Sequence, residues 1–161
     1  MVRIFKFTRI IFALMFALSV IGFSASVALA APPNNYNWTN NWSFTDDTTC
    51  GFTIYITSIG SVHEIDLYDQ NGNLTNSLWH VIEQDTFTAN GKSLVGLPYH
   101  FTWFLVPDKS VGIVEKVPLP NGSLFISAGM VIWSNHSGGF TLFPDRGALG
   151  NIDSFCAALA P

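Results

Sequence analysis

The chain has 161 residues, a length typical of one domain. Charged residues make up 11% of it and hydrophobic residues 48%, which excludes intrinsic disorder and leaves ample material for a packed core. The formal net charge is −4, and three of the seven basic residues lie within the first nine positions. Nucleic acid is not expected as a partner, because the remaining basic residues are scattered singly along an acidic chain: Lys92, Lys109, Lys116 and Arg146.

Residues 1–30 have the layout of a secretory signal peptide. A basic stretch ends at Arg9, an apolar run covers 10–23, and small residues lead to Ala30. The apolar run is shorter than the ~20 residues that a spanning helix needs. We therefore predict cleavage near Ala30 and an extracellular mature protein without a membrane span, with an uncleaved amino-terminal anchor as the alternative. The chain divides into the signal peptide (1–30), an arm rich in Asn and aromatic residues (31–49) and a β-domain (50–161).

The β-domain is predicted from alternating apolar and polar residues. No stretch of ten or more residues shows a helical period, whereas short runs with a period of two recur between Gly and Asn residues. Asn-Gly pairs at 71–72, 90–91 and 121–122 stand where hairpins reverse, because Asn and Gly tolerate positive φ. The expected strands are Phe52–Thr57, Val62–Tyr68, Leu78–Phe87, Leu97–Val106, Val111–Val117, Leu124–Ser134 and Phe140–Phe143.

This pattern predicts an all-β fold. A small antiparallel up-and-down barrel is favoured, and a two-sheet sandwich is the alternative. Cys50 and Cys156 stand at the two ends of the patterned region, and outside the cytoplasm two cysteines are expected to pair. The barrel would then be closed by one disulfide.

Two flanking segments differ from this pattern. In the arm, Tyr36, Trp38, Trp42 and Phe44 fall at even spacing, so they share one face if the arm is extended. That face is either part of an edge strand packed on the domain or an exposed aromatic strip. At the other end, Asp153 is expected to cap a short helical turn over 154–159.

Several short motifs resemble those of a family of secreted bacterial proteins that has no assigned function. They are the opening Cys50-Gly-Phe52, Asn90-Gly-Lys-Ser-Leu94, His100-Phe-Thr102 and the closing Phe155-Cys-Ala-Ala-Leu-Ala160. The resemblance covers the chain from about Cys50 to its end and implies a secreted all-β domain with a disulfide. It implies no activity.

His63 and His80 are the main candidates for chemistry, with Glu64 as a possible acid partner. If Asn71-Gly72 forms a two-residue turn, His63 lies opposite His80 on the neighbouring strand. If a four-residue turn begins at Asp69, His63 lies opposite Trp79 instead and the pair is lost. Two histidines without a third fixed ligand are a weak zinc site, so no metal and no cofactor are predicted.

Three functions remain open. The first is binding of an apolar small molecule inside the barrel, with Phe101, Trp103, Phe125 and Trp133 as candidate contacts. The second is an isomerase, cyclase or other enzyme that transfers protons through His63 and His80. The third is binding of a cell-surface glycan through the aromatic residues of the arm.

We predict that the mature protein begins at Ala31 or Pro32, since the apolar run is too short to anchor it. Amino-terminal sequencing of the protein from the culture medium tests this. A sequence that starts at Met1 and comes from the membrane fraction would contradict the prediction.

Overall fold

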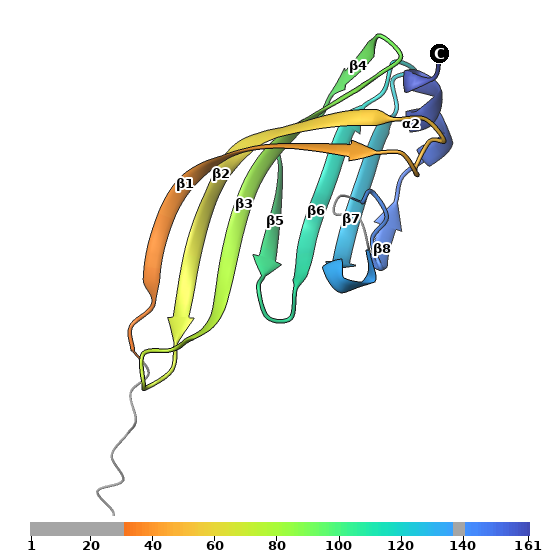
Figure 1. Cartoon of the computed structure of the whole chain (residues 1–161). Coiled ribbons are helices and arrows are strands. Elements are labelled where there is room, and N and C mark those ends of the chain that lie inside the picture. The colour runs from red at the N-terminus through yellow and green to blue at the C-terminus, as the bar shows by residue number, and fades with distance from the viewer. Residues whose placement is uncertain (1–30, 137–140) are drawn as a thin grey trace, which may run out of the picture. The chain divides into compact units, whose positions relative to one another are not determined.

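The structure is a computed structural model that describes residues 31–136 and 141–161, so the predicted signal peptide lies outside the described residues. The described chain forms one strongly curved antiparallel sheet with a helix at one end (Figure 1). Its elements are β1 (Asn34–Asp46), β2 (Ile54–Tyr68), β3 (Leu74–Ala89), β4 (Lys92–Val95), β5 (Tyr99–Phe104), β6 (Lys109–Pro118), β7 (Leu124–Ile132), the 3-10 turn η1 (Trp133–Asn135), β8 (Arg146–Leu149) and α2 (Ile152–Leu159).

The strands follow one another as a meander, in the order β1-β2-β3-β5-β6-β7-β8. The short strand β4 pairs with the last four residues of β3. The next strand, β5, pairs with the middle of β3. All three predicted Asn-Gly reversals join paired strands. Ala89 pairs with Lys92, so Asn90 and Gly91 form a two-residue turn. Both residues of this turn have positive φ.

The sheet is all-β and antiparallel as predicted, but the prediction that it closes into a barrel is wrong. A barrel requires the first and last strands to pair. In the described residues β1 pairs with β2 alone and β8 with β7 alone, and β8 has 4 residues against 13 in β1. The Cys50–Cys156 disulfide, which is confirmed, instead connects the segment after β1 to the helix after β8.

The hydrophobic core lies at the end of the sheet that carries α2. Phe155 and Leu159 of the helix are fully buried against Ile56 and Phe87 of the sheet. We call the face of the sheet that α2 covers the inner face, and the opposite one the outer face. The N-cap of α2 is Asn151, whose side chain accepts a hydrogen bond from the Ser154 backbone N–H at 2.9 Å. The predicted cap, Asp153, lies in the first turn instead.

The register of the β2–β3 hairpin arises from two features together. The reversal is a four-residue turn, with the Gly72 N–H donating to the Asp69 carbonyl at 3.1 Å. The pairing then shifts by one residue at a bulge between Leu67 and Tyr68. His63 therefore lies opposite His80, as the two-residue turn would have placed it, although the turn has four residues.

The arm forms the edge strand β1, and its aromatic residues face inward. Trp38, Trp42 and Phe44 are half-buried, while Tyr36 is 47% exposed. The strand expected at Phe140–Phe143 is not found: Phe140 lies outside the described residues, Thr141–Phe143 are not in a strand, and β8 begins only at Arg146. In residues 31–136 and 141–161, no helix has the length and apolar character that a membrane crossing requires.

We predict that the Cys50→Ser/Cys156→Ser double variant loses about 4–5 kcal/mol of unfolding free energy, because the disulfide closes a loop with a separation of 106 residues. Urea unfolding of both proteins measures the difference. An unchanged midpoint would show that the helix docks equally well without the bond.

Candidate functional site

Cross-strand pairing arranges the inner face in rows of side chains. In the row next to the hydrophobic core, Trp42, Ser58 and Asp85 lie opposite one another on β1, β2 and β3. The following row contains Asn40, Gly60, Glu83 and Tyr99. Beyond it lie two rows that carry most of the aromatic residues: Trp38, Val62, Val81, Phe101, Gly112, Gly129 and Gly147, and then Glu64, Trp79, Trp103, Ser110 and Val131.

Three glycines lie in the row of Phe101. Gly112, Gly129 and Gly147 occupy neighbouring strands of one row, each with a φ between 143° and 146°. A Cβ atom at Gly129 would lie 2.0 Å from the Arg146 carbonyl oxygen, so only glycine fits there. The glycines therefore let the backbones of β5, β6, β7 and β8 approach closely in this row.

All five tryptophans of the chain form a nearly continuous series of ring contacts. The ring centroids of Trp79 lie 5.2 Å from those of Trp38 and 5.1 Å from those of Trp103. Trp42 lies 6.2 Å from Trp38, and Trp133 lies 5.9 Å from Trp103. Offset and edge-to-face contacts at these distances are favourable for aromatic rings.

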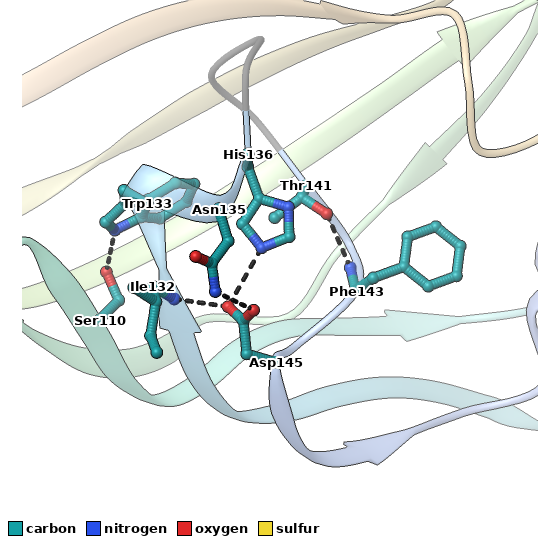
Figure 2. Close-up of polar contacts among 8 residues, drawn as sticks. All are labelled: Ser110, Ile132, Trp133, Asn135, His136, Thr141, Phe143 and Asp145. Carbon is teal, nitrogen blue, oxygen red and sulfur yellow. Dashed lines mark hydrogen bonds and ion pairs between the residues drawn. The ribbon is translucent and has the colours of Figure 1, made fainter.

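Hydrogen bonds fix the orientation of four of these indoles. The N–H of Trp38 donates to Glu64 at 3.0 Å, and that of Trp79 donates to Ser77 at 3.0 Å. Trp103 donates to Asp108 at 2.7 Å, and Trp133 donates to Ser110 at 2.9 Å (Figure 2). Since their polar atoms are engaged by the protein, these rings have their apolar faces available for contact.

The segment that carries Trp133 is held by one carboxylate. Asp145 accepts hydrogen bonds from the Ile132 N–H at 2.6 Å and from Asn135 Nδ2 at 2.8 Å, and it forms an ion pair with His136 at 3.1 Å (Figure 2). These contacts lower the pKa of Asp145 to about 2, and the hydrogen bond from Asn135 contributes most to the shift. The η1 turn is thereby joined to the residues just before β8.

Four of these indoles, those of Trp42, Trp79, Trp103 and Trp133, line an open cleft of about 700 Å³, which we call the tryptophan cleft. Three of the four predicted ligand contacts, Phe101, Trp103 and Trp133, line it. The fourth, Phe125, is fully buried in the core, where its ring packs 4.8 Å from that of Phe155. The other principal lining residues are Trp42, Phe44, Ser58, Trp79, Glu83, Asp85, Tyr99 and Ser110.

Two buried acids line the end of the cleft nearer the core. Glu83 is 4% exposed and Asp85 is 0% exposed. Glu83 accepts a hydrogen bond from Asn40 Nδ2 at 2.6 Å, and the Tyr99 hydroxyl donates to Asp85 at 2.9 Å. Burial and the neighbouring charge of Asp85 raise the pKa of Glu83 to about 7. Burial likewise raises the pKa of Tyr99, so its hydroxyl remains a donor.

A third acid, Glu115, lies beside them and is fully buried. The register shift between Ile113 and Glu115 turns it onto the inner face. As a carboxylate it has no hydrogen-bond donor within reach. Burial, followed by the charge of Asp85 and a hydrogen bond to it, raises the pKa of Glu115 well above its usual range. Glu115 is therefore protonated at neutral pH and can donate to Asp85.

The predicted histidine pair lies on the outer face, on the opposite side of the sheet from the cleft. The rings of His63 and His80 are stacked with centroids 6.3 Å apart. His63 Nδ1 lies 2.9 Å from Asn37 Oδ1, and His80 Nδ1 lies 3.0 Å from Thr102 Oγ1. They share a separate depression of about 510 Å³ with His100. The predicted acid partner, Glu64, is on the inner face with Trp38 and is not part of this group.

No group of three or more His, Cys, Asp or Glu side chains in the described part of the chain is arranged to hold a metal ion. The residues that line the cleft offer aromatic surfaces and carboxyl groups.

Asp85, Tyr99 and Trp79 were not among the predicted site residues, although the sequence contains the signal that identifies them. Val81 and Phe87 are apolar and buried, and every second residue between them, Glu83 and Asp85, shares their face. The acids therefore point inward by the same alternation that predicts the strand.

Comparison with family models, with curated proteins and with solved structures found no match. Membership of the secreted bacterial family thus stays a prediction.

We predict that stability falls as the pH rises from about 5 to about 8. Glu83 has a pKa of about 7 in the folded protein and 4.5 in a free side chain, so the unfolded chain loses this proton first. At about 1.4 kcal/mol per pKa unit, the loss from Glu83 is about 3 kcal/mol. Glu115 acts in the same direction.

Urea unfolding at about pH 5 and about pH 8 measures this difference for the native protein and for Glu83→Gln. The groups that face Glu83 are Asn40, Ser58, Asp85 and Tyr99, and the variant leaves all four in place. Its stability should depend less on pH, because glutamine does not ionise. An equal pH dependence in both proteins would contradict the assignment to Glu83.

Proposed function

We propose that the protein is secreted and binds an apolar small molecule in the tryptophan cleft. The observation that carries the proposal is the hollow of about 700 Å³ lined by indole and phenyl rings. Small-molecule sites usually measure about 300–1,000 Å³ and are lined mainly by apolar and aromatic side chains with a few polar groups. The cleft has this size and this lining.

The position of the core supports the proposal. The residues that hold the fold together pack against α2, at the other end of the inner face. The tryptophan cleft lies beside that core rather than inside it. Aromatic surface left open to water is unfavourable by about 25 cal/mol per Å². A ligand that covers these rings gains that free energy on binding.

The disulfide supports the predicted location. A bond between Cys50 and Cys156 persists in an oxidising compartment such as the extracellular space. The two other functions considered from the sequence gain less support. Trp38 of the arm packs against Trp42 and Trp79 and is half-buried, so these rings do not form a fully exposed strip for a glycan. His63 and His80 would need a substrate bound on the outer face.

The neutral fluorophore N-phenyl-1-naphthylamine, which emits strongly only in apolar surroundings, provides a test. We expect it to bind the mature protein and expect Trp103→Ala to weaken binding by about tenfold, the equivalent of about 1.4 kcal/mol. Trp42→Ala, which changes the edge strand, should weaken it in the same direction. Emission titrations of the three proteins give the dissociation constants.

Tyr55→Ala is the matched control, since Tyr55 is an aromatic residue of the outer face and is 60% exposed. It should bind the fluorophore as the native protein does. Equal losses in Tyr55→Ala and Trp103→Ala, or no binding by the native protein, would refute the proposed function. Circular dichroism of each variant shows whether it is folded.

A further inference from the structure

We propose that the ligand of the tryptophan cleft carries a protonated amine, which the carboxyl groups of Glu83 and Asp85 hold. This inference rests on the proposed function and names the chemical class of the ligand. It follows from an imbalance between hydrogen-bond acceptors and donors at one end of the cleft, and from the lack of a basic side chain there among residues 31–136 and 141–161.

The acids have more acceptor atoms than the protein supplies with donors. Three carboxyl groups are buried together, and the four carboxylate oxygens of Glu83 and Asp85 meet few donors: Asn40, Tyr99, Ser58 and the protonated Glu115. One of these contacts is long, at 3.4 Å from the Tyr99 hydroxyl to Glu83 Oε2. Oδ1 of Asp85 and Oδ1 of Asn40 are buried without a partner. Unsatisfied buried acceptors are rare in proteins and are completed by ordered water, an ion or a ligand.

The basic residues of the described chain do not compensate these charges. Lys92 donates to the Ala160 carbonyl beside α2, and Lys109 lies over the Phe104 ring with 5.1 Å between Nζ and the ring centroid. By the strand registers, Lys109, Lys116 and Arg146 belong to the outer face. The one ion pair found within residues 31–136 and 141–161 joins His136 to Asp145.

A primary ammonium group fits this environment. It has three N–H donors and no acceptor, so it can satisfy the open oxygens without adding another. Its charge is opposite to that of the acids, which offsets the cost of keeping carboxylates away from water. The aromatic rings of the cleft also attract cations through their π faces. An alcohol would supply one donor, and a carboxylate none.

The apolar part of the ligand is assigned to the other end. The two rows that follow the acids carry Phe101 in one and Trp79 and Trp103 in the other. The acids and these rings line one continuous cleft. The structure therefore selects a molecule with an amine at one end and a hydrophobic body, such as an alkylamine or an arylalkylamine.

Octylamine, octanol and octanoate have the same chain length and differ in the head group, so they test the inference. Isothermal titration of the mature protein near pH 8 should show octylamine binding at least about tenfold more tightly than octanol, and octanoate binding most weakly. Glu83→Gln and Asp85→Asn should each weaken octylamine by about tenfold and change octanol little. Asp153→Asn, an exposed acid of α2, is the matched control and should change neither.

The outcomes separate the two proposals. If octanol binds as tightly as octylamine, or if both acid variants bind octylamine normally, the amine assignment is wrong while the proposed function stands. If none of the three compounds nor the naphthylamine fluorophore binds, the proposed function itself fails. Because Glu83→Gln removes a buried ionisable group, it should remain folded, and it keeps the test valid if Asp85→Asn does not fold.

Discussion

The pairing of β2 with β3 decides what each face of the sheet carries. In a strand, successive side chains point to opposite faces, so a shift of one residue exchanges the entire set. The bulge between Leu67 and Tyr68 sets this register before the strands reach the site. It places Glu83 and Asp85 inside and the paired histidines outside. The cleft, its acids and the neighbouring tryptophans all depend on that local irregularity.

The two ends of the inner face obey different physical requirements. At the α2 end, Phe87, Phe125 and Phe155 fill the space between sheet and helix, and the disulfide keeps the helix in place. Toward the other end, the aromatic residues of the inner face line the tryptophan cleft instead of filling it. The filled end provides the free energy of folding that allows the neighbouring surface to remain hollow and to keep three acids away from water.

Much of this arrangement could be predicted from the sequence. Alternation gave the strands, the Asn-Gly pairs gave the reversals, and the cysteines gave the disulfide. Closure could not be predicted, because it depends on whether β1 meets β8, which are far apart in sequence and unequal in length. Of the site, Phe101, Trp103 and Trp133 were predictable as aromatic residues on strand-like runs. The location of Phe125 was not, because alternation assigns a face and not a position along it.

The chain of ring contacts that joins all five tryptophans has a spectroscopic consequence. Excited indoles about 5–6 Å apart transfer energy among themselves, so the ultraviolet emission of this protein originates from a single coupled group. That emission reports on the cleft and its neighbourhood and hardly at all on the core at the helical end, whose buried rings are phenylalanines. A partial unfolding in which α2 detaches while β2, β3 and β5 stay paired would leave the emission nearly unchanged, although the circular dichroism would change. The two signals thus follow two different halves of the same sheet.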